Sequence, residues 1–240
     1  MVLHYLYDPL CGWCYAAESM IEAASRNAPG KYAIKLHAGG LFSRTHLPDA
    51  KRSYIRVADA RIGELTGQVF GEAYLNGLLS EPNTIYDSAM PIRGILAAEA
   101  VKPGNDLPML KALQRAHYRS GLRIVELPTI VQVAETIGLD AVTFTAAFER
   151  VGEAELTRHL GHTHRMMQEI GAHGYPTFVV QTGKHFEVLP HDRFYGDAEG
   201  FAERLSSIFS PRDTTPDPTQ ETTQAAPRGF GRCTGDSCEL

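Results

Sequence analysis

Four cysteines in two close pairs are the residues of this chain whose spacing best fits chemistry. Cys11 and Cys14 enclose Gly12-Trp13 near the N-terminus, and Cys233 and Cys238 lie near the C-terminus. Two thiols separated by two residues can exchange disulfides, because one forms a mixed disulfide and the other resolves it. The same spacing is also half of many zinc sites. A four-thiolate site would have to recruit the distant second pair, so redox chemistry is the preferred interpretation and no metal is expected.

The elements around the first pair explain which thiol reacts. Residues 2–7 are rich in β-forming side chains and predict a strand, and apolar residues recur at helical spacing from Gly12 onward. A cysteine at the start of a helix meets unpaired amides and the positive end of the helix dipole, which stabilise a thiolate. We therefore expect Cys11 to be the nucleophile and Cys14 the resolving thiol.

The rest of the chain reads as an α/β protein with a helical middle. Residues 32–37 predict a second strand that completes a βαβ unit. Apolar stripes then predict a run of helices near 54–66, 88–101, 106–119, 128–138 and 140–150. After a helix near 153–171, β structure returns at 177–180 and 185–189, and Asp197 caps a last amphipathic helix. Beyond Phe209 the chain is rich in Pro and Thr, which predicts a flexible tail.

Two motifs together resemble the thioredoxin superfamily: Cys11-Gly12-Trp13-Cys14 after a strand, and Gly174-Tyr175-Pro176-Thr177 before a later strand. The helical middle narrows the resemblance to the DsbA-like branch. Within it, Asp8-Pro9-Leu10-Cys11-Gly12-Trp13-Cys14-Tyr15 and Gly138-Leu139-Asp140 resemble the FrnE-type members, and the resemblance covers about residues 1–209. The resemblance implies an α/β, thioredoxin-like fold with an inserted all-helical domain. Residues 1–48 and 152–209 would form the discontinuous thioredoxin-like domain, 49–151 the helical insertion, and 210–240 the flexible C-terminal tail with the second Cys pair.

The resemblance also implies the roles of a second loop. Tyr175-Pro176 would be a cis peptide bond lying against the two sulfurs, and the backbone of Tyr175 would pair with an extended substrate. Trp13, Tyr175 and Pro176 are therefore expected to bind substrate. The alternative, in which Pro176 only begins a strand, stays open because Pro is tolerated there.

Proton transfer to the thiols has no obvious residue. Thioredoxin-like enzymes often hold a buried carboxylate on the first strand, whereas this strand offers His4 and two tyrosines. Asp8 is expected to cap the following helix. Three further imidazoles, at His159, His162 and His164, are interpreted as a solvated helix face on which the third points away from the first, and His173 as an exposed loop residue.

The predicted function is thiol–disulfide exchange on protein or peptide disulfides through a mixed disulfide at Cys11. A glutathione-dependent transferase or isomerase of the same fold, and a peptide-binding chaperone, are the alternatives. No cofactor is expected beyond a thiol reductant such as glutathione or a thioredoxin system. Cys233 and Cys238 are a possible second redox pair, because a ~22-residue flexible linker spans about 25 Å and could reach Cys11.

Composition limits the partners. Apolar residues make up 43% of the chain and charged residues 21%, with a net charge of −5. This mild acidity gives no reason to expect nucleic acid or an anionic membrane as a partner. No secretory leader is recognisable at the N-terminus, so the cytoplasm is the expected location. A cytoplasmic setting favours reduction or isomerisation over net oxidation.

Overall fold

The computed structural model describes residues 1–209. Cys233 and Cys238, and with them the predicted tail and second redox pair, lie outside the described residues. Among residues 1–209, no helix combines the length and the apolar character that a membrane crossing requires.

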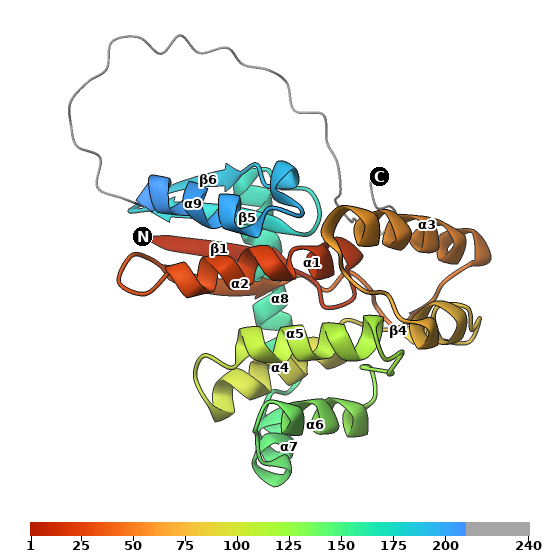
Figure 1. The fold of residues 1–240 in the computed structure, drawn as a ribbon. Coiled ribbons are helices and arrows are strands. Elements are labelled where there is room, and N and C mark those ends of the chain that lie inside the picture. The colour runs from red at the N-terminus through yellow and green to blue at the C-terminus, as the bar shows by residue number, and fades with distance from the viewer. Residues whose placement is uncertain (210–240) are drawn as a thin grey trace, which may run out of the picture.

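A four-stranded mixed sheet forms the centre of the fold (Figure 1). Its strands lie in the order β2-β1-β5-β6 and span Ala33–Ala38, Val2–Tyr7, Thr177–Thr182 and His185–Leu189. β1 runs parallel to β2, with Tyr5 opposite Leu36, and antiparallel to β5, with Tyr5 opposite Phe178. The N-terminal strand thus pairs with a strand from the far end of the described chain, and β1 is an inner strand of the sheet between β2 and β5.

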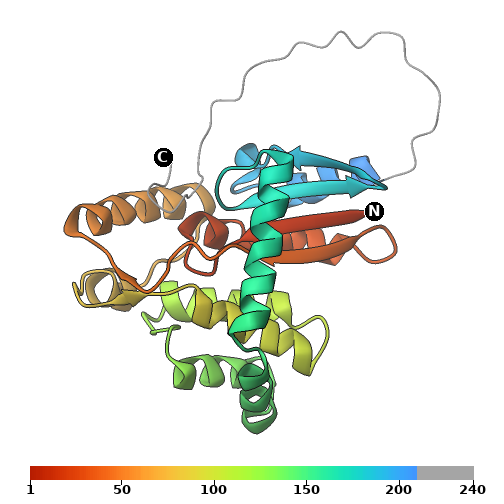
Figure 2. The ribbon, with the colours of Figure 1, turned by 180° about the vertical axis from the view of Figure 1, so that it is seen from behind.

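Helices cover both faces of this sheet. On one face lie α1 (Gly12–Ala16), α2 (Glu18–Asn27) and α9 (Ala198–Phe209). On the other face α8 (Glu153–Ile170) runs across the strands, as the view from behind shows (Figure 2). Phe178 of β5 is fully buried on the α1 side, with its ring centroid 4.8 Å from those of both Tyr5 and Phe201. Because side chains alternate along a strand, His4 points to the opposite face, toward α8.

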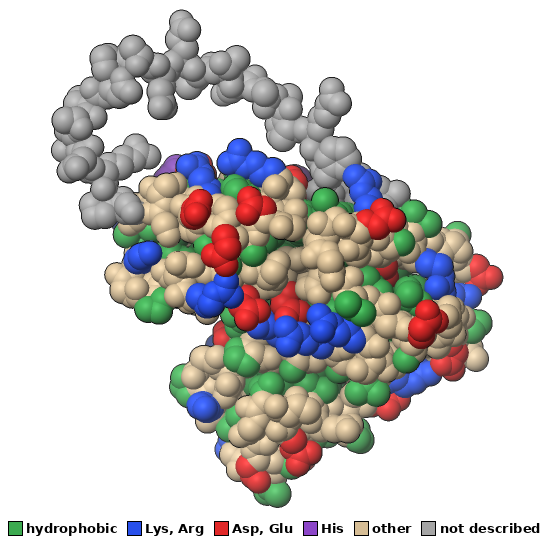
Figure 3. Space-filling view, in the orientation of Figure 1, with side chains coloured by type: hydrophobic (Ala, Val, Ile, Leu, Met, Phe, Trp, Pro, Cys, Tyr) green, Lys and Arg blue, Asp and Glu red, His purple; other side chains and the backbone are tan. Residues whose placement is uncertain are grey.

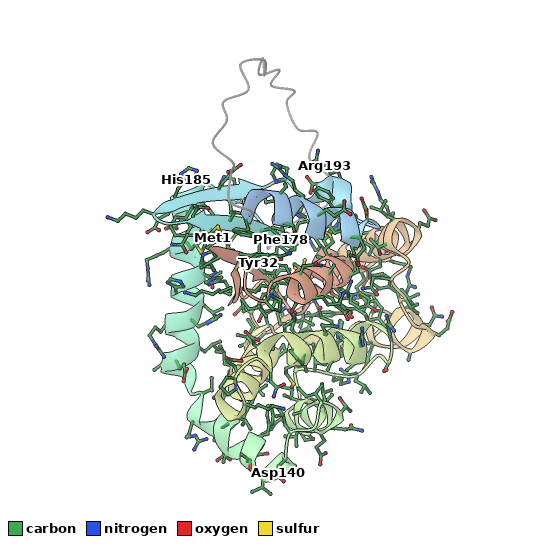
Figure 4. The ribbon with its side chains drawn as sticks, turned by 60° about the vertical axis from the view of Figure 1, so that its left-hand side comes forward. Met1, Tyr32, Asp140, Phe178, His185 and Arg193 are labelled. Carbon is green, nitrogen blue, oxygen red and sulfur yellow. The ribbon has the colours of Figure 1, made fainter. Side chains whose placement is uncertain are left out.

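The segment between β2 and α8 is helical, as predicted. Its elements are β3 and β4 at Thr45–His46 and Ile85–Tyr86, the π-helix η1 at Ala73–Leu78, and the helices α3 to α7 at Asp49–Thr66, Ala89–Val101, Asp106–Tyr118, Leu127–Thr136 and Ala141–Arg150. Asp140 caps α7 by accepting a hydrogen bond from the Thr143 amide at 2.8 Å. It lies at the opposite end of the molecule from His185 on the sheet (Figure 4).

The predicted fold class, an α/β sheet with a helical insertion, is confirmed. Two details of the prediction were wrong. The helix after Cys11 is divided at Ala17 into α1 and α2, and α3 begins at Asp49, five residues before the expected start. The elements η1, β3 and β4 had no counterpart in the prediction. The proposed domain boundaries remain a proposal.

Candidate active site around Cys11 and Cys14

Cys11 and Cys14 are free thiols at the end of β1. Cys11 is the N-cap of α1, and its sulfur accepts a hydrogen bond from the Cys14 amide at 3.3 Å. The Cys11 thiol also donates to the backbone oxygen of Tyr175 at 3.4 Å. Both cysteines are 0% exposed, so a disulfide substrate reaches Cys11 only when neighbouring groups move. The arrangement matches the expected strand, cysteine turn and helix.

The two thiols differ in their surroundings. Burial raises the pKa of the Cys14 thiol well above its ordinary value, and the hydrogen bond and charge of Cys11 raise it further. The Asp8 amide donates to the Cys14 sulfur at 3.5 Å, which opposes this effect only in part. Cys14 is therefore protonated at neutral pH when the pair is reduced. Such an asymmetry suits a thiol that acts second in exchange.

Tyr175 and Pro176 bring the second loop against the first. The peptide bond between them is cis, the isomer that the resemblance implied. Thr177 steadies the turn by donating from its hydroxyl to the Gly174 oxygen at 2.9 Å. Tyr175 is 6% exposed, and the outer end of its ring lies against Gly39, where a Cβ atom would come within 2.0 Å of the phenol oxygen. The absence of a side chain at Gly39 makes room for this ring.

Trp13 is buried in this conformation, as Cys11 is, and its expected role in substrate binding stays a prediction. Its side chain is 1% exposed and its ring centroid lies 4.9 Å from that of Tyr195. The Tyr195 hydroxyl donates to the Trp13 carbonyl at 3.4 Å. The only tryptophan of the chain is thus part of the packing beneath the motif, and in this conformation a substrate finds almost none of it.

Asp8 does not cap the helix, because Cys11 holds that position. The carboxylate is fully buried and instead accepts hydrogen bonds from the amides of Leu10 at 2.9 Å and Leu41 at 2.6 Å and from the Ser88 hydroxyl at 3.0 Å. Burial raises the pKa of Asp8, and these hydrogen bonds oppose the rise. Asp8 therefore fastens the turn after β1 to the segment after β2 and to the start of α4.

His4 cannot move protons for Cys14, since it lies on the other face of β1. One ring nitrogen is 2.9 Å from His37 Nε2 and the other 2.9 Å from the Gln181 side-chain oxygen. By contrast, the neighbouring Tyr5 faces the motif and donates from its hydroxyl to the Cys14 carbonyl at 3.2 Å. The period-two alternation of a strand separates these adjacent residues.

The histidines of α8 are not simply a solvated face. His159 Nε2 accepts from the Ala38 amide at 3.0 Å, and His164 Nε2 lies 2.6 Å from the Gly39 oxygen. The two rings thus hold consecutive residues at the end of β2, and the expectation that His164 points elsewhere was wrong. His162 and His173 are exposed, as expected. Within residues 1–209, no group of three or more His, Cys, Asp or Glu side chains could hold a metal ion.

A second acid lies beside the motif and was not predicted from the sequence. Asp59 of α3 is 2% exposed, and its Oδ1 lies where it would come within 2.8 Å of a Cβ atom at Gly12. Asp59 lies 45 residues after Cys14 in a predicted helix, and its sequence does not indicate a contact with Gly12. Only the packing of α3 against α1 brings the two together.

A hollow with a volume of about 860 Å³ lies away from the thiols, between α2 and β2 on one side and α5 and α6 on the other. Lys111 and Arg115 of α5 cross it to pair with Glu22 and Glu18 of α2. Figure 3 shows the resulting band of basic side chains beside acidic ones. These pairs fasten the inserted helices to the sheet domain.

The family model for the DSBA-like thioredoxin domain matches residues 2–196. The chain belongs to the DsbA-like thioredoxin family. It is similar to the cytosolic disulfide reductase DsbM from Pseudomonas aeruginosa, with 37% identity and a TM-score of 0.81 over 87% of this chain and 98% of that one. The structure of DsbM with glutathione matches with 36% identity and a TM-score of 0.79, over the same shares of the two chains.

A more distant match supports the fold alone. A protein assigned as a disulfide isomerase from Nitrosomonas europaea is 24% identical, with a TM-score of 0.73 over 86% of this chain and 97% of that one. A comparison with curated proteins gave no match. The DsbA-like resemblance and the thioredoxin-like fold are thus confirmed, as is membership of a family of disulfide oxidoreductases. The FrnE-type assignment stays a prediction.

Proposed function

We propose that this chain is a cytosolic disulfide reductase that acts on protein or peptide disulfides and is itself reduced by a thiol of the glutathione class. The observation that carries the proposal is the meeting of two backbone groups at one sulfur. Cys11 Sγ caps α1 by accepting from the Cys14 amide, and its thiol donates to the Tyr175 oxygen. The similarity to DsbM, a cytosolic disulfide reductase described with and without glutathione, supports the direction, the location and the reductant.

The reaction would proceed in two exchanges. The Cys11 thiolate attacks one sulfur of the substrate disulfide, the S–S bond breaks, and the leaving sulfur takes up a proton. The thiol of Cys14 then gives up its proton and attacks Cys11 Sγ, which releases the second substrate thiol and leaves a Cys11–Cys14 disulfide. Two thiols of the reductant restore the pair and leave as their own disulfide.

The cis loop would hold the substrate during these steps. Movement of the Cys11 thiol away from the Tyr175 oxygen frees that oxygen for a donor on an extended peptide. Pro176 has no amide, so the backbone of Tyr175 carries the pairing. Trp13, in contrast, would act through its packing under α1.

A thiol-release assay with trapping tests the proposal. The background chain carries Cys233→Ser and Cys238→Ser, so that only Cys11 and Cys14 can react. In that chain we expect glutathione-dependent reduction of a disulfide protein, its loss in Cys11→Ser, and accumulation of a mixed disulfide in Cys14→Ala. Val142→Ala, at a side chain that is 78% exposed, is the control and should react like the background.

Other outcomes would identify the alternatives. Reduction that persists in Cys11→Ser contradicts the proposal. Glutathione conjugation of an electrophile that is unaffected by Cys14→Ala would instead indicate a transferase. Protection of an unfolding protein from aggregation, without any exchange, would indicate a chaperone.

A further inference from the structure

Asp59 places a buried carboxyl group directly against the cysteine motif. A Cβ atom at Gly12 would lie 2.8 Å from Asp59 Oδ1 and 3.3 Å from Ile62 Cδ1, so a side chain at this position would displace the Asp59 carboxyl group. Gly12 is the first residue of α1 and directly follows Cys11. The carboxyl group therefore touches the backbone of the turn in which exchange would take place.

The surroundings of Asp59 are aromatic and largely closed to water. The Tyr74 hydroxyl donates to Asp59 Oδ2 at 2.8 Å. Burial raises the pKa of Asp59 to about 7, while the Tyr74 hydrogen bond and the charge of Arg56 oppose the rise. Several other titratable and charged groups face Asp59: Tyr74 of η1, Tyr86 of β4, His117 and Tyr118 of α5, and Lys51 and Arg56 of α3. The two cysteines and, on the far side of the motif, the Asp8 carboxyl complete this set.

Two negative charges at this place would oppose each other. A thiolate on Cys11 and a carboxylate on Asp59 would both lie at the first turn of α1, where the helix dipole favours a single anion. Charges a few ångströms apart in a protein interior interact by more than thermal energy. Coupling of this kind is reciprocal, so each group takes up its proton more readily when the other is charged.

We propose that Asp59 is a positioning residue that takes up a proton when the Cys11–Cys14 disulfide is reduced and gives it back when the disulfide forms. This inference rests on the proposed function. The step balances: two reductant thiols deliver two electrons and two protons to the disulfide. The products are a Cys11 thiolate, a Cys14 thiol, the disulfide of the reductant and one proton, and the Asp59 carboxylate binds that proton.

The electrostatic part of the proposal is tested by titrating the Cys11 thiolate in Asp59→Asn. Ultraviolet absorbance reports the thiolate against pH in the reduced chain, again with Cys233 and Cys238 replaced by Ser. Because each charge opposes the other, thiolate formation should extend over a broadened pH range when Asp59 is present, and Asp59→Asn should narrow that range and complete thiolate formation at lower pH. Glu64→Gln, the same charge change at an exposed position of α3, is the matched control and should leave the titration in place.

Two further measurements separate proton uptake from a structural role. The infrared difference spectrum between reduced and oxidised chain should contain a protonated-carboxyl band near neutral pH that is absent in Asp59→Asn. In Tyr74→Phe the carboxyl loses its donor, so the pH range over which this band appears should move upward. This second variant keeps the test decisive if Asp59→Asn folds poorly.

The results distinguish this inference from the proposed function. Exchange that survives in Cys11→Ser overturns the proposed function and this inference with it. Exchange that depends on Cys11, combined with a thiolate titration in Asp59→Asn that overlays the unmodified chain and no carboxyl band on reduction, overturns the role of Asp59 alone.

Discussion

Gly39→Ala should displace the loop that faces Cys11 without touching either thiol. An added Cβ atom would lie 1.9 Å from Tyr175 Cζ and 2.0 Å from its phenol oxygen, distances at which the ring must move. The backbone φ of Gly39 is not in the left-handed region, so the conformation itself allows alanine. The effect of the substitution is therefore an effect on Tyr175.

The size of the effect follows from the burial of the ring. A tyrosine ring removes about 150–250 Å² from water, which at roughly 25 cal/mol per Å² gives a ceiling of about 4–6 kcal/mol for complete expulsion. The clash involves the outer end of the ring, so partial displacement is enough to relieve it. We expect the free energy of unfolding to fall by about 2–3 kcal/mol, in the range observed for overpacked cores.

Urea unfolding and the thiol-release assay measure the two consequences. Gly39→Ala should be less stable and should also exchange more slowly, because the Tyr175 oxygen contacts Cys11 Sγ. In a Tyr175→Ala background the space is empty, so the same substitution should be nearly neutral. The two changes would then couple by about 2 kcal/mol. Gly77→Ala in η1, where no atom lies within 4 Å of the added Cβ, is the control.

Additivity would refute this reasoning. If Gly39→Ala lowers stability equally with and without the Tyr175 ring, the ring is not what the added methyl group meets. An unchanged stability in the single variant would refute the close contact itself.

Four other predictions concern buried polar groups. Ser88→Ala should lower the free energy of unfolding in urea by about 1–3 kcal/mol, because the hydroxyl donates to Asp8 and accepts from the Phe42 amide, whereas exposed Ser53→Ala should not. Arg115→Ala should lower the free energy of unfolding in urea by about 1–3 kcal/mol, because it leaves the carboxylate of Glu18, which is 4% exposed, without its partner. The loss should be smaller than for a wholly buried pair, since the Arg115 side chain is 47% exposed. The exposed pair of Arg26 and Glu199 should contribute almost nothing to the free energy of unfolding. Burial raises the pKa of Asp59 from 3.8 to about 7, so the folded state binds the extra proton and stability should fall as pH rises through that window; the slope should be lost in Asp59→Asn and kept in Glu64→Gln. Burial lowers the pKa of His117 from 6.5 to about 3, so the free energy of unfolding should decrease as pH falls from 6.5 to about 3. His117→Leu should remove this decrease, which urea unfolding of the variant and the unmodified chain at each pH would show.

The sequence was sufficient for what local pattern determines. Strand-forming residues at 2–7 and the helical spacing from Gly12 placed Cys11 correctly at a helix start. The helices predicted near 128–138 and 140–150 are found at Leu127–Thr136 and Ala141–Arg150. Each of these signals spans only a few residues of the chain.

What sequence could not provide were contacts between distant segments. The strand alternation that sends His4 away from Tyr5 was readable, but which face would receive the motif depended on the packing of α1. The contact between Trp13 and Tyr195, 182 residues further on, has no signal in the sequence around the motif. A single glycine does not indicate which distant side chain packs against it. The contacts of the Tyr175 ring with Gly39 and of Asp59 with Gly12 could therefore not be predicted from the sequence.

These long-range contacts bring the segment between β2 and α8 against the cysteine motif. Asp59 and Ser88 both belong to the segment between β2 and α8, and they reach the motif from two directions. Ser88 holds Asp8, whose amide donates to the Cys14 sulfur, while Asp59 lies against the residue after Cys11. A chain that kept only the sheet, α1, α2, α8 and α9 would retain both thiols and the cis loop but lose both contacts. If the helices only enclose the site, Ser88→Ala and Asp59→Asn should alter stability alone. A change in the pH dependence of exchange in either variant would mean that the insertion also adjusts the reactivity of the thiols.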